Sequence, residues 1–153
     1  MNRSKIWYSL VLLAAASGFA HAAAAKTCEV AIEGDDAMKF NKTEIAIAGD
    51  CTEVRLTLKH TGKLPVTAMG HNWVLTQTSD FQSVANDGAK AGPKADYLPS
   101  NDPRIIAHTK LIGGGESTSV TFPTSKLKQG GDYTFFCSFP GHWAQMKGKL
   151  KFG

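Results

Sequence analysis

Apolar and polar residues alternate in several short segments of this chain. In residues 53–60 the apolar positions Val54, Leu56 and Leu58 alternate with charged or hydroxyl side chains, which is typical of a strand with one buried face. Turns rich in Gly, Asp, Pro and Lys separate such segments. The expected strands lie at residues 28–32, 43–48, 53–60, 71–75, 118–122, 133–137 and 149–152. This pattern predicts an all-β protein that folds as a Greek-key β-sandwich.

One segment has the features of a helix. Residues 80–90 follow Thr78 and Ser79, which could serve as N-caps, and glycines at its end would limit its length. Residues 96–104 contain two prolines and predict a long surface loop. We therefore expect one short helical flap on the sandwich, without a repeat, a linker or a second domain.

The first 25 residues have the form of a cleaved signal peptide. Arg3 and Lys5 precede an apolar run at 6–16, and Ala23-Ala24-Ala25 has the form of a cleavage site. The run is too short to span a bilayer, so an uncleaved anchor is the weaker alternative. Cleavage before Lys26 would leave residues 26–153 as one exported domain without a membrane segment. It would lower the formal charge from +4 to +2 by removing two basic residues, which gives no case for nucleic acid.

Three metal-binding residue types lie close together near the end of the chain. Cys137, His142 and Met146 offer a thiolate, an imidazole and a thioether, with no carboxylate between them. Such donors suit a soft or borderline transition metal better than magnesium or calcium. Cu(I) favours sulfur and Cu(II) favours nitrogen, so a mixed site can hold both with little rearrangement. Copper is the expected metal, although zinc could occupy the same donors because affinity alone selects poorly between metals.

The spacing of these donors favours a loop between two strand ends. Pro140 and Gly141 interrupt any helix before His142, and the gaps differ from the Cys-x2-Cys pairs of structural zinc modules. The alternative is a free buried cysteine beside an incidental histidine and a core methionine. A further strong ligand is needed, and His71 at the start of an apolar strand is the best candidate. Taken alone, a histidine in that position is more often a hydrogen-bonded core residue.

Three separated motifs resemble the cupredoxin family of blue copper proteins. They are Met69-Gly-His-Asn-Trp-Val-Leu75, Ile106-Ala-His-Thr-Lys-Leu-Ile-Gly113 and Phe135-Phe-Cys-Ser-Phe-Pro-Gly-His142, in matching order and spacing. The resemblance runs from about Lys26 to the C-terminus. It implies one type 1 copper ion in a cupredoxin-like domain, with His71, Cys137 and His142 in a trigonal plane, Met146 as a distant axial ligand and the Gly70 carbonyl opposite.

The resemblance also implies roles for residues around these ligands. The backbone N–H groups of Asn72 and Phe139 would point at the thiolate, and the Asn72 side chain would tie the two ligand loops together. Leu64 and Met69 would join an apolar patch around His142 through which a redox partner docks. That patch would comprise Leu64, Met69, Phe139, Pro140, Gly141, His142, Trp143 and Ala144.

Two residues in the ligand loop depart from the family pattern. Trp143 stands where a small residue is common, and Gln145 stands where an aliphatic residue is common. We expect these two residues to alter the choice of partner rather than copper binding.

The other two cysteines form a candidate disulfide. With Cys137 assigned to the metal, Cys28 and Cys51 remain as a pair in a compartment that favours disulfides. The competing hypothesis places all three cysteines in one metal cluster. The resemblance implies a disulfide at these two positions.

Two further histidines need separate interpretation. His60 shares the apolar phase of its strand, so we expect it to be at least partly buried, with a hydrogen-bonded core histidine as the default. By its position in the family, its protonation could instead be coupled to the redox state. His108 is expected on the surface, without a role.

The motifs favour a small soluble electron carrier over two other classes of protein. A copper oxidase or reductase needs an open coordination position or further copper centres, and five histidines are too few. A storage or chaperone protein would expose runs of Met or His, which are absent from the sequence. We therefore expect a periplasmic protein, not an enzyme, that makes transient contacts with cytochromes or periplasmic oxidoreductases.

Overall fold

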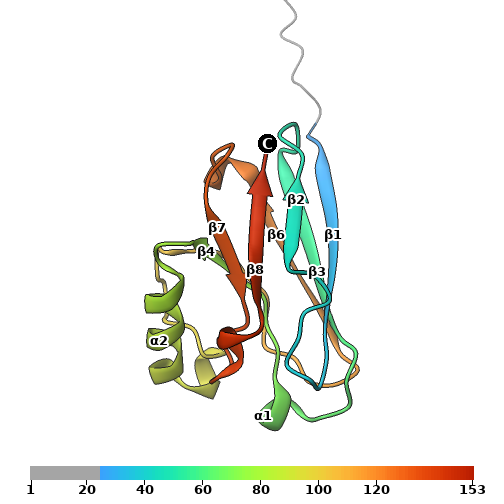
Figure 1. The fold of residues 1–153 in the computed structure, drawn as a ribbon, viewed down its shortest axis with the longest axis vertical. Coiled ribbons are helices and arrows are strands. Elements are labelled where there is room, and N and C mark those ends of the chain that lie inside the picture. Colours follow the sequence, from blue (N-terminus) through green and yellow to red (C-terminus); the bar gives the residue numbers. More distant parts are fainter. Residues whose placement is uncertain (1–24) are drawn as a thin grey trace, which may run out of the picture.

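The computed structural model describes residues 25–153 as two β-sheets that pack face to face, with one helix against the outside (Figure 1). The predicted signal peptide lies outside these residues except for Ala25, so its cleavage stays a prediction. Within the described residues, none of the helices combines the length and apolar character needed to cross a lipid bilayer.

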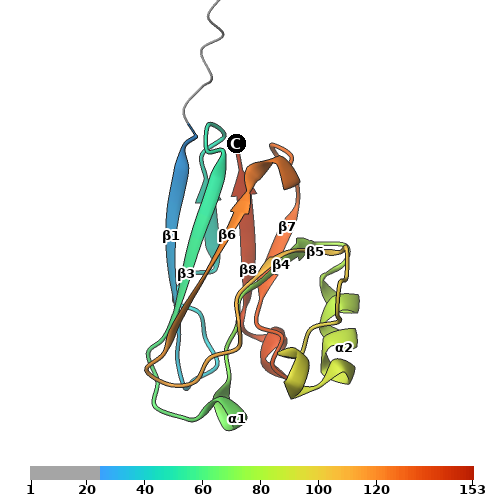
Figure 2. The same cartoon turned by 180° about the vertical axis from the view of Figure 1, so that it is seen from behind.

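The first sheet has three strands in the order β1-β3-β6 and is seen from the front in Figure 2. β1 (Thr27–Gly34) runs parallel to β3 (Glu53–His60), and β6 (Ser117–Pro123) runs antiparallel to β3. The alternation in β3 is the one expected from sequence: Val54, Leu56, Leu58 and His60 are buried, and the intervening side chains are more exposed. The exposed phase faces solvent because an antiparallel or mixed sheet can leave one face uncovered.

The second sheet has five strands in the order β2-β8-β7-β4-β5. β2 (Glu44–Ile47) pairs in parallel with β8 (Lys147–Phe152), and the other pairs are antiparallel. The remaining strands are β7 (Tyr133–Phe136), β4 (Val74–Gln77) and β5 (Ile105–His108). The two sheets confirm the all-β sandwich, but β5 was missed by the sequence analysis because a single buried residue, Ala107, does not produce a pattern.

The main core fills the space between the sheets. Its largest members are fully buried, and Trp73 stacks between Phe122 of one sheet and Phe135 of the other, with both pairs of ring centroids 6.1 Å apart. Aromatic rings bury large apolar areas, so this stack holds the two layers in a fixed relation. The ends of the strands are thereby held in place relative to one another.

The helical flap is α2 (Phe81–Ala91), within one residue of the predicted helix at each end. Its N-cap is Asp80, rather than Thr78 or Ser79. The helix covers the outer face of the five-stranded sheet through a second apolar cluster, and β4 and β7 are therefore buried on both faces. This cluster comprises Val74, Val84, Ala85, Leu98 and Phe136, with Phe81, Ile105 and Trp143 packed against it.

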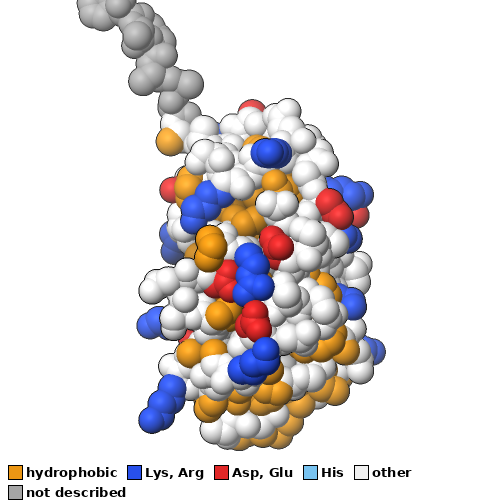
Figure 3. All heavy atoms as spheres, turned by 90° about the vertical axis from the view of Figure 1, so that its left-hand side faces the viewer, with side chains coloured by type: hydrophobic (Ala, Val, Ile, Leu, Met, Phe, Trp, Pro, Cys, Tyr) orange, Lys and Arg blue, Asp and Glu red, His pale blue; other side chains and the backbone are white. Residues whose placement is uncertain are grey.

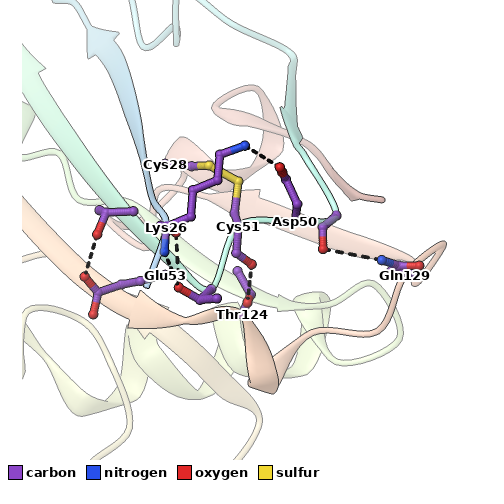
Figure 4. Close-up of a disulfide and its surroundings, with 10 residues drawn as sticks. Lys26, Cys28, Asp50, Cys51, Glu53, Thr124 and Gln129 are labelled. Carbon is purple, nitrogen blue, oxygen red and sulfur yellow. Dashed lines mark hydrogen bonds and ion pairs between the residues drawn. A yellow bond between two sulfur atoms is a disulfide. The ribbon is translucent and has the colours of Figure 1, made fainter. Parts of the chain in front are cut away.

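A disulfide between Cys28 and Cys51 confirms the predicted pairing (Figure 4). It joins the start of β1 to the residue that precedes β3 by two positions, at the end of the molecule near the C-terminus (Figure 1). Around it, Thr124 Oγ1 donates to the Cys51 carbonyl at 2.6 Å, and Lys26 pairs with Asp50 at 2.6 Å. Helix α1 (Val66–Met69), for which the side-chain pattern gave no prediction, lies at the opposite end.

Candidate metal centre

The strand pairing brings the C-terminal donors together at the end of the sandwich that carries α1. Cys137 directly follows β7, and Met146 directly precedes β8. These two strands pair with Phe136 opposite Lys147, and the Cys137 N–H donates to the Met146 carbonyl at 3.0 Å. His142 begins a single 3-10 turn, η3 (His142–Ala144), in the connecting loop. The loop therefore folds back so that its histidine lies beside its cysteine.

His71 enters this group from a distant part of the chain. Its backbone exchanges two hydrogen bonds of 2.9 Å with Ile112, just before β4 begins. Its ring Nε2 lies 2.8 Å from the Asp35 carbonyl, and Nδ1 lies 3.9 Å from the Cys137 sulfur. The Asp35 carbonyl holds the tautomer with the proton on Nε2, which leaves Nδ1 free to bind a metal.

The donor atoms have the spacing that a single transition metal needs. One donor atom from each of His71, Cys137 and His142 lies within 4.8 Å of the others, and Cys137 Sγ is 3.7 Å from His142 Nδ1. Metal bonds of 2.0–2.3 Å in a trigonal plane would put neighbouring donors about 3.7 Å apart. The Gly70 carbonyl oxygen lies 3.7 Å from the sulfur, and Met146 is fully buried. The sulfur and nitrogen set therefore fits copper in size and in chemistry.

Burial controls the protonation of the donors. It raises the pKa of the Cys137 thiol to about 12, against the opposing effect of N–H donors from Asn72 and Phe139. It lowers the pKa of His142 to about 4, with a further contribution from the His71 charge. The His71 pKa is also lowered by burial, although the Asp35 carbonyl opposes the shift. At neutral pH the metal-free site thus holds a thiol and two neutral imidazoles, and a metal ion must displace only the thiol proton.

These shifts predict a stability window for the metal-free protein. His142 has a folded pKa near 4 against 6.5 when unfolded, so the unfolded state binds more protons between these values and stability is lost as the pH falls through them. Cys137 has a folded pKa near 12 against 9.0, so stability is lost as the pH rises through that range. We expect urea unfolding to give a maximum between these ranges, with losses of roughly 3 to 4 kcal/mol on each side.

A His142→Gln variant is the control for the acid side of this window. It should reduce the slope between pH 4 and 6.5 to the share that the lowered His71 pKa contributes, and leave the alkaline side unchanged. A wild-type profile without any slope between these two pH values would contradict the assignment of His142.

The side chain of Asn72 makes hydrogen bonds between the two ligand segments. Its Oδ1 accepts the Ser138 N–H at 2.8 Å, and its Nδ2 donates to Ser138 Oγ at 2.7 Å and to the Asp96 carbonyl at 3.1 Å. The backbone N–H groups of Asn72 and Phe139 act on the Cys137 sulfur as hydrogen-bond donors that oppose the rise of its pKa. Ser138 and Asp96 were missed by the sequence analysis, because bonds to a backbone carbonyl follow no residue pattern.

Gly34 is another functional position without a sequence signal. A Cβ atom there would lie 2.8 Å from His71 Cδ2 and 3.2 Å from Met146 Cε. A contact below 3 Å forces one of the neighbours to move, and both neighbours are metal-binding candidates. Glycine at position 34 therefore allows β1 to pack directly against two donor side chains.

We expect Gly34→Ala to shift the visible absorption bands of the copper form, because the His71 ring or the Met146 thioether must move. The measurement is the optical spectrum at full copper loading. Gly130→Ala is the control for a strained backbone outside the site: an added Cβ there meets nothing within 4 Å, but φ 68° disfavours alanine, so stability should fall while the spectrum stays unchanged. Identical spectra for Gly34→Ala and wild type would contradict the close packing described above.

His60 is fully buried and stacks on His71, with ring centroids 4.2 Å apart. The Gly62 N–H donates to its Nδ1 at 3.1 Å, so the proton is on Nε2, which lies 2.8 Å from the Met69 carbonyl. These bonds belong to a neutral imidazole. The coupling of His60 protonation to the redox state stays a prediction. His108 is exposed, as expected.

The residues of the predicted docking patch lie at the end that carries α1. Leu64 and Val66 are the large apolar side chains exposed in the described part of the chain, at 42% and 37%. His142 is 3% exposed, and its ring lies 4.5 Å from that of Phe139. Hydrophobic side chains gather over this end in Figure 3.

The half-buried Trp143 turns its ring toward Phe81 of α2, and the two ring centroids are 6.0 Å apart. Its membership of the patch stays a prediction.

A two-sheet sandwich with His, Cys, His and Met gathered at one end defines a mononuclear copper protein of the cupredoxin type. Comparison with known sequences agrees, because the family described as "Copper binding proteins, plastocyanin/azurin family" matches residues 26–153. The chain belongs to this family. The family expected from the three motifs is thereby confirmed.

Several azurins are similar to the chain over most of their length. The azurin of Alcaligenes faecalis is 57% identical over 126 residues, which is 82% of this chain and 98% of that protein. The azurin of Pseudomonas aeruginosa is 52% identical over 126 residues, or 82% of this chain and 85% of that protein. The solved structure of azurin Az-iso2 from Methylomonas sp. strain J aligns with a TM-score of 0.80 at 42% identity, covering 82% of this chain and 98% of that one.

Proposed function

We propose that this protein carries single electrons through one type 1 copper ion and transforms no substrate. The observation that carries this proposal is the buried group of His71, Cys137, His142 and Met146, whose spacing fits one metal with mixed sulfur and nitrogen donors. When bound, copper would supply a Cu(I)/Cu(II) couple. The azurins named above align with 82% of this chain, and one of them shares its fold, which supports the same role here.

The chain's own residues suit this role because they limit movement at the site. Cys137 and Met146 are held by strand pairing, His71 by two backbone bonds, and His142 by a loop that closes on itself with a Met146 N–H bond of 2.7 Å to its carbonyl. Donors that cannot rearrange keep nearly the same positions in both oxidation states, so little reorganisation accompanies each electron. The burial of all four side chains also excludes water from the site.

The test is copper loading of the purified protein. We expect one copper per chain and an intense visible thiolate-to-copper absorption that bleaches reversibly on reduction. A site that binds zinc firmly but gives no reversible couple with copper would contradict the proposal. Catalytic turnover of a substrate by the copper form would favour an enzyme instead.

Redox proteins are the partners of an electron carrier, and we propose that cytochromes or periplasmic oxidoreductases dock on the apolar patch around His142. Export to the periplasm is supported by the signal-type leader and by the Cys28–Cys51 disulfide, because disulfides persist in oxidising compartments. His142 is 3% exposed and the other three donor side chains are 0% exposed, so His142 is the donor that can meet a partner at the surface.

Leu64→Glu should slow electron self-exchange by roughly tenfold at low salt, because two like charges would meet when two patches touch. Line broadening in mixtures of reduced and oxidised protein measures this rate. Ala46→Glu on the distant strand β2 is the matched control, since Ala46 is exposed and lies outside the patch. Equal rates for the two variants would contradict the placement of the patch.

In the same assay, an unchanged self-exchange rate for Trp143→Ser would place the indole outside the patch.

A further inference from the structure

Two consecutive residues between α2 and β5 have a left-handed backbone. Asp96 has φ 52° and Tyr97 has φ 54°. Residues other than glycine rarely adopt this conformation, and it persists only where the surrounding contacts impose it. A bulky residue such as tyrosine is an unusual occupant. The contacts that impose it therefore indicate what the pair does.

The Asp96 carbonyl oxygen points at the residues that hold the cysteine. It accepts hydrogen bonds of 3.1 Å from Asn72 Nδ2 and 3.1 Å from Ser138 Oγ. Both donors are fully buried, and the Asn72 side chain also accepts the Ser138 N–H. The Asp96 carbonyl thus holds the side chains of Asn72 and Ser138. These two side chains connect the segment before β4 to the segment after β7.

Tyr97 makes a second connection from the flap to the site. Its ring packs edge to face on Phe139, with centroids 5.2 Å apart, and the Phe139 ring in turn lies 4.5 Å from that of His142. The backbone of Tyr97 is held by α2: its N–H donates to the Gly92 carbonyl at 3.0 Å, and a Cβ atom on Gly88 would collide with its carbonyl oxygen. The position of α2 therefore determines where both residues of the pair lie.

We propose that Asp96 and Tyr97 are positioning residues that hold the Asn72 and Phe139 N–H groups on the Cys137 sulfur and so set the reduction potential from the flap. The proposal rests on the proposed copper function. Hydrogen bonds to a thiolate stabilise its negative charge and weaken its donation to the metal. Loosening them strengthens that donation, favours Cu(II) and lowers the potential. The hydrogen bonds of Asp96 reach Asn72 and Ser138, and the ring of Tyr97 reaches Phe139, so their effect passes through these three residues.

The variants Asp96→Asn and Asp96→Val test the backbone conformation with matched charge. Both remove the carboxylate, but asparagine tolerates the left-handed region and β-branched valine does not. We expect Asp96→Val to have a lower potential than Asp96→Asn, by roughly threefold to tenfold in the equilibrium constant with a mediator, where tenfold equals 59 mV for one electron. NMR shifts of the Asn72 and Phe139 amides should change in the metal-free Asp96→Val protein and not in Asp96→Asn.

Equal potentials and equal amide shifts in two folded Asp96 variants would overturn the proposal. If Asp96→Val does not fold, the reduction potentials and amide shifts of Tyr97→Leu and Tyr97→Phe are compared instead. Only phenylalanine keeps a ring against Phe139, so the two variants should differ. Equal values for that pair would likewise overturn it. If wild type shows no reversible copper couple, the proposed function fails, while the amide shifts of the metal-free variants still report on the positioning.

Discussion

Replacing Cys137 with serine is expected to abolish the intense visible absorption of the copper form and its reversible redox couple. A hydroxyl is a hard ligand with a very high pKa, so the variant loses the thiolate that makes Cu(I) stable in the site. Loss of an outer partner of a metal ligand typically costs 10–100-fold in affinity or activity, and loss of this ligand should cost more than about 100-fold. Visible spectroscopy, metal analysis and self-exchange rates measure the three effects.

The matched control is the double variant Cys28→Ser with Cys51→Ser, which removes two sulfur atoms at the far end of the molecule. It should keep its visible absorption. Cys137→Ser itself should still fold, because the substitution changes little volume at a fully buried position. An intense visible band in Cys137→Ser would contradict the role of the thiolate.

The same double variant should lose about 3 kcal/mol of unfolding free energy, because the disulfide closes a loop across a sequence separation of 23 residues. The bond restricts the unfolded chain, and its removal restores that entropy. At 25 °C this loss lowers the ratio of folded to unfolded protein by roughly 100-fold. Denaturant unfolding of the metal-free form measures it.

Wild type under reducing conditions provides the control for this loss. It should lose the same stability as the double variant, whereas the double variant should be insensitive to reductant. Since the loss arises far from the metal donors, the oxidised copper form of the double variant should have the wild-type spectrum. A stability within about 0.5 kcal/mol of wild type would show that the bridge contributes little.

All strands except β5 could be read from the pattern of side chains, and three of the donors from their residue types and spacing. Cys137 and Met146 share the phase of inward-facing residues on neighbouring strands, so the pairing of β7 with β8 was enough to bring them together. His71 was a weak candidate by pattern alone and depended on the resemblance of its motif. Its distance from the C-terminal loop in sequence explains this, because no local periodicity reports on long-range pairing.

Other parts of the fold left no readable pattern. β5 has a single fully buried residue and α1 has none, so neither shows a period of buried positions. The N-cap of α2 was misplaced because Thr78 is used elsewhere: its Oγ1 donates to Asp132 Oδ1 at 2.8 Å. The predicted loop at 96–104 exists, but it contains the buried Leu98 and the left-handed pair that connects the flap to the site.

The sequence by itself determined the layers of the sandwich, the mixed sulfur and nitrogen donor set and the pairing of the remaining cysteines. These features depend on residue type and on periods of two, which are local properties. Only the tertiary structure decided the contacts of Gly34 with two donor side chains and of the Asp96 carbonyl with Asn72 and Ser138. Such contacts join segments that are far apart in the chain. A backbone oxygen is present in every residue type, and a glycine has no side chain, so neither gives a pattern in the sequence.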